Sequence, residues 1–100
     1  MISVNVSFIG SDVLKLTVSG HANYDKYGKD IVCAGVSAVV TGGINALENQ
    51  VENIEIINEE NKLGVKVINS NEYIQIVLKT IIIQLETIEN SYKKYIKITK

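Results

Sequence analysis

The sequence contains no proline, no tryptophan and no arginine, and it has one cysteine and one histidine. A single cysteine cannot form an internal disulfide, and no charged-then-apolar signal segment opens the chain, so we expect a reducing, cytoplasmic location. One histidine and one cysteine cannot supply the four ligands of a structural zinc site, so we expect neither a metal ion nor another cofactor. Without arginine the chain lacks the bidentate group that proteins use on phosphates, which disfavours tight phosphate recognition.

The charges nearly balance. The formal net charge is −1 and the pI is near 5.8, so no basic surface is indicated and we do not expect nucleic-acid binding. The longest apolar stretch, residues 73–88, is interrupted by Lys79 and Glu86 and by two glutamines. A membrane span needs roughly twenty mostly apolar residues. We therefore expect no transmembrane helix.

Strand-like alternation of apolar and polar residues marks the beginning of the chain. Residues 2–8 and 14–18 alternate, with turn residues from Gly10 to Asp12 between them. This period is typical of half-buried strands, so residues 2–20 are predicted to form a β-hairpin that ends at His21. Short strands at 54–57 and 65–68 predict a second hairpin, and a last strand is predicted at 94–99.

Two helices are predicted between these strands. Asp30 is a good N-cap residue for a helix that runs to about Gln50, and Ser70 or Asn71 can cap a second one that runs to about Ser91. The predicted order is therefore ββαββαβ, in one domain over residues 1–100 with 46% hydrophobic residues. We expect an α+β fold in which two helices pack on a small mixed sheet, over one face or over each face.

The first predicted helix is apolar nearly all round, which favours a fully buried helix. Gly35, Gly42 and Gly43 each cost such a helix roughly 1 kcal/mol relative to alanine. We expect these glycines to let a sheet or a partner helix approach closely. The second helix has two apolar rows, which is more apolar surface than one small sheet needs to cover. The pattern leaves open whether part of that surface lies in a dimer interface or in the core of one chain.

The only histidine lies before the first predicted helix, and the only cysteine lies near the start of that helix. With Asp30 as N-cap, Cys33 occupies the first helical turn, where the partial positive charge of the helix favours a thiolate. His21 closes the preceding strand, and the intervening loop is long enough to bring its imidazole to the sulfur as ion-pair partner or general base. A structural cysteine and an unrelated histidine would explain the same pattern, so spacing alone leaves both interpretations open.

The loop between these two residues, 22–29, is polar and aromatic with no sustained period. It is either a solvated connector or a lid that opens for a substrate backbone and closes over the cysteine. Tyr24 and Tyr27 would supply the apolar contacts of a lid, and Gly28 would give its backbone the freedom to swing. The predicted gating segment consists of Ala22, Asn23, Tyr24, Tyr27 and Gly28.

Residues 20–37 carry short motifs in a fixed order: Gly20-His21-Ala22, Tyr27-Gly28, Asp30-Ile31-Val32-Cys33-Ala34 and then Ser37. Together they resemble the signature of the bacterial ribosomal-processing cysteine proteases, the Prp family. The resemblance covers the whole chain in length and order of elements, but its specific part is confined to residues 20–37. It implies that His21 and Cys33 form a catalytic dyad, and that the substrate is the N-terminal extension of a large-subunit ribosomal protein, cut after an aromatic residue. It also implies a homodimer.

The chemical hypothesis is thiol proteolysis. Cys33 attacks the scissile carbonyl, His21 holds the thiolate and later protonates the leaving amine, and free N–H groups at the helix start stabilise the oxyanion. Asp30 either orients His21 or only caps the helix, and Ser37, one turn beyond Cys33, either supports the site or bonds back to the Cys33 carbonyl.

Two other functions remain open at this stage. One is a non-catalytic peptide- or ribosome-interaction module in which Cys33 is structural. The other is anion binding at the start of the first helix, which the negative charge of Asp30 disfavours.

Overall fold

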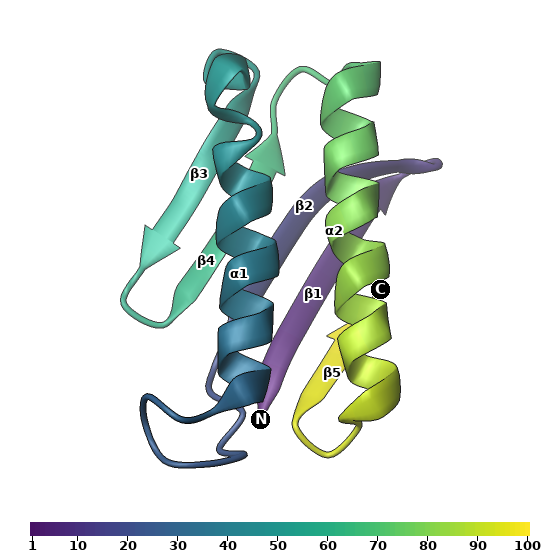
Figure 1. The fold of residues 1–100 in the computed structure, drawn as a ribbon. Helices are drawn as coiled ribbons and strands as arrows, with labels where there is room; N and C mark the ends of the chain where they lie inside the picture. The colour runs from purple at the N-terminus through teal and green to yellow at the C-terminus, as the bar shows by residue number, and fades with distance from the viewer.

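The computed structural model describes residues 1–100, and its elements follow the predicted order ββαββαβ (Figure 1). The strands are β1 (Ile2–Ile9), β2 (Asp12–Ser19), β3 (Ile54–Glu59), β4 (Lys62–Val67) and β5 (Ile96–Thr99). The helices are α1 (Ile31–Asn45) and α2 (Glu72–Ser91), with a short 3-10 turn at Glu48–Gln50. The predicted α+β fold is confirmed.

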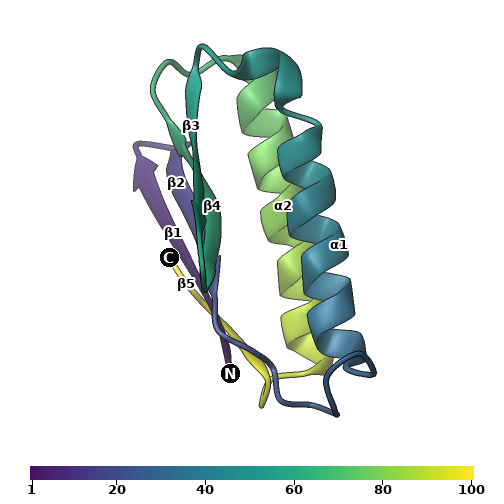
Figure 2. The same ribbon diagram turned by 90° about the vertical axis from the view of Figure 1, so that its left-hand side faces the viewer.

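The strands form one mixed sheet in the order β3-β4-β2-β1-β5. β1 and β5 are parallel, and all other neighbours are antiparallel. Seen edge-on, both helices cover the same face of the sheet and leave the other face open (Figure 2). The alternation in β1 fits this arrangement, because Ile2, Val4 and Val6 are buried in the core while the residues between them are exposed.

α1 begins as predicted but ends earlier. Asp30 is its N-cap, and the last helical residue is Asn45, not a residue near Gln50. Beyond that point the N–H of Leu47 bonds to the Ile44 carbonyl three residues back, a tightening that is common at helix ends. Leu47 is fully buried. Its burial turns the chain toward the core and away from the helix axis.

The prediction that α1 is buried all round is wrong. Its buried residues are Val32, Val36 and Val40, whereas Ala34 and Ala38 are exposed. The two helices lie in one layer on the sheet, so each has an outward side that no other element of the chain covers (Figure 2). The number of apolar residues along a helix does not reveal which side of the helix faces away from the sheet.

Glycine sets the contact between α1 and α2 at one position. A Cβ atom on Gly43 would run into the side chain of Ile81, so the two helices approach there as predicted. At Gly35 an added Cβ would make an ordinary contact with Ile88 at 3.6 Å, and at Gly42 it would meet open space. Only Gly43 therefore requires the absence of a side chain for helix packing.

α2 buries one row of apolar side chains and exposes part of the other. Its cap is Asn71, whose side-chain oxygen accepts the Ile74 N–H at 2.9 Å, as one of the two predicted caps. The row Ile74, Leu78 and Ile82 is buried, whereas Tyr73 of the other row is 45% exposed. Ile76 and Ile83 belong to neither row and are 58% and 62% exposed, so they lie outside the core of one chain. Neither helix has the length and hydropathy that a membrane span requires.

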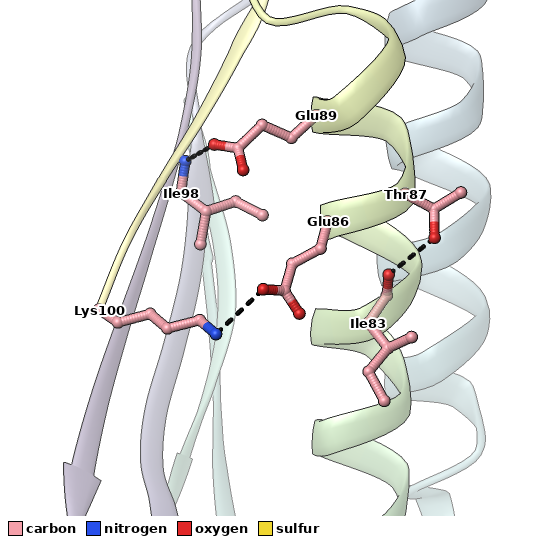
Figure 3. A network of polar contacts seen from close by, with 6 residues as sticks. All are labelled: Ile83, Glu86, Thr87, Glu89, Ile98 and Lys100. Atoms are coloured by element: carbon pink, nitrogen blue, oxygen red, sulfur yellow. Dashed lines mark hydrogen bonds and ion pairs between the residues drawn. The ribbon is translucent and has the colours of Figure 1, made fainter.

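Polar contacts fix β5 to the end of α2 (Figure 3). A carboxylate oxygen of Glu89 accepts the N–H of Ile98 at 2.7 Å, and Lys100 forms an ion pair with Glu86 at 3.0 Å. β5 is an edge strand, so the first of these bonds satisfies a backbone donor that the sheet itself leaves unpaired. The last strand is thereby held both to β1 and to the helix that precedes it.

Candidate active site

Asp30 ties the start of α1 to the loop before it. Its Oδ1 accepts the N–H groups of Val32 and Cys33, both at 3.0 Å, and its Oδ2 accepts the Tyr24 N–H at 2.9 Å. Burial by itself would raise the pKa of Asp30, but hydrogen bonds from the backbone of Cys33 and Tyr24 and from the Cys33 side chain hold it below its usual value of 3.8. Asp30 is therefore an ionised cap, and no hydrogen bond joins it to His21.

Cys33 lies in the first turn of α1, beside the chain that leaves β2. Its Sγ accepts a hydrogen bond from the backbone N–H of Ala22 at 3.3 Å, and the residue is half-buried. Ala22 is buried and directly follows His21, so this bond fixes the His21 backbone near the sulfur. His21 is exposed and lines the same two cavities as Cys33. No direct hydrogen bond joins the two side chains.

The expectation of free N–H groups at the helix start is wrong for Val32 and Cys33. Both the Val32 and the Cys33 N–H groups are donated to Asp30, and the Ala34 N–H bonds to the Asp30 carbonyl at 3.0 Å. The physical reason is the cap itself, because the side chain that starts the helix occupies the donors that an oxyanion would need. Anion binding at this helix start is disfavoured for two reasons: these N–H groups already bond to Asp30, and the Asp30 carboxylate is negatively charged.

Two cavities meet at Cys33. The hairpin-side cavity, of about 260 Å³, is bounded by α1 and the turn that joins β3 to β4. Besides His21 and Cys33 its lining includes Val18, Val36, Ser37, Val40, Thr41 and residues 58–63. The loop-side cavity, of about 590 Å³, is bounded by α1 and the loop 22–29, and its lining includes His21, Asn23, Tyr27, Gly28, Cys33 and Ser37. An extended chain that crosses Cys33 can therefore occupy both.

The base of the loop is anchored on the far end of the chain. The Tyr24 ring packs edge-on against Tyr92, with centroids 5.6 Å apart, and against Tyr95, with centroids 5.0 Å apart. The backbone of the same residue is held by Asp30. Tyr24 therefore supplies apolar contacts, as predicted, but it makes them with the α2–β5 connection.

The tip of the loop has no such support. The Lys29 N–H bonds to the Lys26 carbonyl at 2.9 Å and closes a turn in which Gly28 has a φ of 83°. Tyr27 is fully exposed within this turn, and Asn23 before it has a φ of 55°. The predicted gating residues thus divide into an anchored base, Ala22 and Tyr24, and an exposed remainder.

The family model described as cysteine protease Prp matches residues 1–97. The chain belongs to this family. Among curated proteins it is similar to the ribosomal processing cysteine protease Prp of Staphylococcus aureus, with 36% identity over 98% of this chain and 97% of the relative. The Bacillus subtilis protein of the same name is 32% identical over 87% of this chain and 85% of the relative.

Solved Prp structures share the whole fold. The crystal structure of an essential ribosomal processing protease Prp from S. aureus with a covalently linked product peptide has a TM-score of 0.92 and 31% identity, and the match covers 99% of this chain and 98% of that one. The S. aureus Prp structure with a substrate peptide has a TM-score of 0.85 and 30% identity. This chain is accordingly a ribosomal-processing cysteine protease of the Prp family.

Some residues around the candidate site were not expected from the sequence. Thr41 and the β3–β4 turn line the hairpin-side cavity, and only the register of β4 beside β2, with Leu63 opposite Val18, brings that turn near α1. Ser37 was expected near the site and lines both cavities, while no hydrogen bond joins it to the Cys33 carbonyl. No group of three or more His, Cys, Asp or Glu side chains is arranged to hold a metal ion.

Proposed function

We propose that this Prp-family protease removes the N-terminal extension of a large-subunit bacterial ribosomal protein by cutting after an aromatic residue with a Cys33–His21 dyad. The observation that carries the proposal is the position of the only cysteine. Cys33 lies where the hairpin-side and loop-side cavities meet, beside His21, in a chain that belongs to a cysteine protease family. A ribosomal substrate also implies the cytoplasmic location expected from the sequence.

The reaction uses the sulfur and the imidazole in two half-reactions. The Cys33 thiol gives its proton to His21, the sulfur bonds to the scissile carbonyl carbon, and the C–N bond then breaks as the imidazolium protonates the leaving amine. His21 next takes a proton from water, whose oxygen attacks the thioester and releases the carboxylate product and the free thiol. Before the reaction, the hydrogen bond from the Ala22 N–H to the Cys33 sulfur holds the His21 backbone near that sulfur.

The oxyanion needs a donor other than the Val32 and Cys33 N–H groups, because both of them bond to the Asp30 carboxylate. The Ala22 N–H lies 3.3 Å from Sγ. When the sulfur bonds to the substrate carbon, the former carbonyl oxygen is attached to that same carbon, and we expect it to come within reach of this donor. We assign the Ala22 N–H to oxyanion stabilisation, a role in which one donor is typically worth about 10²–10³ in kcat.

The other supporting residues act through these groups. Asp30 positions Cys33 and Tyr24 by holding both backbone N–H groups, so it is a positioning residue that does not touch the imidazole. Ser37 lines both cavities, so we expect it to face the substrate backbone. The exposed turn with Tyr27 and Gly28 covers the loop-side cavity when substrate is bound.

The protein is further proposed to be a homodimer, with the outward side of α2 in its interface. Ile76 and Ile83 are separated by two helical turns and therefore share one side, where both are more than half exposed. Ile83→Lys should shift the mass measured by light scattering after size exclusion from dimer to monomer. Ile9→Lys, at an equally exposed isoleucine of β1, is the control and should leave the dimer intact.

Mass spectrometry of a peptide that spans the ribosomal protein's extension and the cleavage point tests the proposed activity. Wild-type protein should cut the peptide once, after the aromatic residue, and Cys33→Ser should not cut it. A cut with both proteins would contradict the role of Cys33. Peptide binding without a cut by wild-type protein would favour the non-catalytic interaction module instead.

A further inference from the structure

Four of the ten lysines lie in two exposed turns of the chain. Lys26 and Lys29 flank the tip of the loop 22–29, where the N–H of the second bonds to the carbonyl of the first at 2.9 Å. Lys93 and Lys94 occupy the turn between α2 and β5, which a backbone bond of 2.9 Å between the flanking tyrosines closes. All four are exposed, so each turn presents two ammonium groups to solvent.

The two turns lie side by side, at the end of the molecule that carries Cys33. The Tyr24 ring of the loop packs against Tyr92 and Tyr95, the tyrosines that flank the second turn. Both views place the loop and the α2–β5 turn at the end where α1 begins (Figures 1 and 2). We call the exposed surface of these two turns the basic end. It consists of Lys26, Lys29, Lys93 and Lys94.

The carboxylates near the basic end bond to backbone donors. Asp25 accepts the N–H of the next residue at 2.7 Å, Asp30 accepts N–H groups of the loop and of α1, and Glu89 accepts an N–H of β5 at 2.7 Å. The one ion pair of the chain joins Lys100 to Glu86. The ammonium groups of the basic end therefore have no carboxylate partner within the chain.

The opposite end of the molecule is acidic. Residues 48–60 contain five glutamates and no lysine. The 3-10 turn that begins at Glu48 and the start of α2 at Glu72 both lie at the end away from the loop (Figures 1 and 2). The net charge of −1 averages over this separation. A polyanion is attracted to the end with Cys33 and repelled by the other end, which orients the encounter.

The proposed substrate indicates which polyanion meets this end. A ribosomal protein binds RNA in its assembled state, so RNA lies beside the protein that carries the cleavage point. Every nucleotide of RNA carries a negatively charged phosphate, and lysine binds phosphate as a point charge without reading the base sequence. A surface of lysines without arginine therefore suits the backbone of RNA of any sequence.

We infer that Lys26, Lys29, Lys93 and Lys94 form a docking surface for the phosphodiester backbone of RNA, beside the active site. The inference rests on the proposed function, because it takes this RNA to be the one that holds the ribosomal substrate. The protease then acts on its substrate in the RNA-bound state, and RNA and cleavage point meet the same end of the molecule.

Anisotropy of a fluorescein-labelled oligouridylate at several salt concentrations tests the surface without any cleavage. With one phosphate per lysine, the slope of log K against log salt should be about −3, so the affinity falls about fiftyfold between 50 and 200 mM salt. Lys93→Gln/Lys94→Gln should reduce this slope to about half. Lys15→Gln/Lys66→Gln is the matched control, because it removes the same charge from an exposed pair on β2 and β4 and should keep the full slope.

Equal slopes for the two double variants would overturn the inference, and so would an absence of binding by wild-type protein at 50 mM salt. Vesicles that contain phosphatidylglycerol are the comparison for a lipid surface. If wild-type protein binds these vesicles more tightly than the oligouridylate, the surface belongs to a membrane contact and the inference is wrong.

Cleavage of the precursor ribosomal protein, alone and bound to large-subunit ribosomal RNA, tests the consequence for activity. At 50 mM salt, the RNA should raise kcat/KM of wild-type protein and Lys15→Gln/Lys66→Gln by about tenfold, because RNA binding raises the effective concentration of the cleavage point at Cys33. Lys93→Gln/Lys94→Gln should lose this gain. All three proteins should cut a short peptide equally, since none of these lysines lines a cavity at Cys33.

The two assays separate this inference from the proposed activity. If wild-type protein cuts neither peptide nor precursor, the proposed activity fails, and the docking surface still stands when the salt slopes of the two double variants differ. If the peptide is cut but RNA leaves cleavage of the precursor unchanged, or raises it equally in Lys93→Gln/Lys94→Gln, the inference fails and the proposed activity stands.

Discussion

The rings of Tyr24 and Tyr95 meet edge to face, with centroids 5.0 Å apart and planes inclined by 77°. One tyrosine lies in the loop between His21 and Cys33, and the other lies just before the last strand. Edge-on aromatic pairs contribute about 0.5–1.5 kcal/mol beyond the area that they bury. This contact therefore gives the loop a fixed base close to Cys33 while its tip stays exposed.

Removing the Tyr95 ring should loosen that base. In Tyr95→Ala, we expect faster amide hydrogen exchange throughout residues 22–29 and a lower kcat/KM, because Tyr24 loses one of its two aromatic partners. Tyr27→Ala is the control, since Tyr27 is fully exposed and its removal should not change exchange at Tyr24. Unchanged exchange in Tyr95→Ala would mean that Asp30 alone holds the loop.

Asp30 should make stability depend on acid pH. Its folded pKa is lowered, so its ionised form stabilises the fold above the usual value of 3.8, and this contribution is lost as the pH falls through the lower folded value. Asp30→Asn keeps a capping oxygen but cannot titrate. We expect a lower Tm than wild type at pH 7 and a difference that narrows below about pH 4. A constant difference across this range would show that the carboxylate charge does not matter.

His21 and Ser37 should differ sharply in their effect on catalysis. His21→Ala removes the proposed proton carrier and should lower kcat by about 10²–10⁴. Ser37→Ala should change kcat/KM by less than about tenfold, because Ser37 lines the cavities but transfers no proton. Both positions are exposed, so thermal unfolding curves should match wild type and establish that each variant is folded. A larger loss for Ser37→Ala than for His21→Ala would reverse the assigned roles.

An ester in place of one amide tests the oxyanion donor. Replacing Ala22 with lactic acid removes its N–H and keeps its methyl group, and the only cysteine offers a ligation junction between Val32 and Cys33. We expect kcat to fall by about 10²–10³ with KM nearly unchanged. The same replacement at Ala34, whose N–H bonds to the Asp30 carbonyl, is the control for a lost backbone hydrogen bond. Equal losses at both positions would argue against a catalytic role for the Ala22 N–H.

Two adjacent glycines should respond to alanine in opposite ways. Gly43→Ala places a methyl group against the Ile81 side chain, so we expect the free energy of unfolding to fall by about 1–3 kcal/mol. Gly42→Ala meets open space within the same helix and should raise it by about 0.5–1 kcal/mol. Urea denaturation of both variants measures the difference. A stabilising Gly43→Ala would mean that α1 and α2 can separate at no cost.

Local signals in the sequence predicted most of the fold. The alternation in residues 2–8 and the capping side chains of Asp30 and Asn71 act within a few residues, so their outcome does not depend on distant parts of the chain. The exposed side of α1 could not be predicted, because apolar periodicity does not reveal how many layers cover a helix. The end at Asn45 depends on burial of Leu47, which is a tertiary contact.

The site shows the same division. His21 and Cys33 could be chosen as candidates from motif and spacing. The pairing of Leu63 with Val18, which brings the β3–β4 turn to the hairpin-side cavity, arises from strand register. The two occupied N–H groups at the start of α1 were missed for a simpler reason. A capping aspartate predicts the start of a helix, and it also predicts that backbone N–H groups of the first helical turn bond to the cap. The sequence analysis used the first of these consequences but not the second.

The parallel pairing of Ile2 with Ile96 joins the two strands that are farthest apart along the chain. Closing so long a loop costs conformational entropy before any contact is gained, so we expect β5 to join the sheet late in folding. Tyr95 arrives with it. A partly folded chain would therefore already contain the helix that bears Cys33 but would lack the anchor for Tyr24, so proteolytic competence should develop only at the last step of folding.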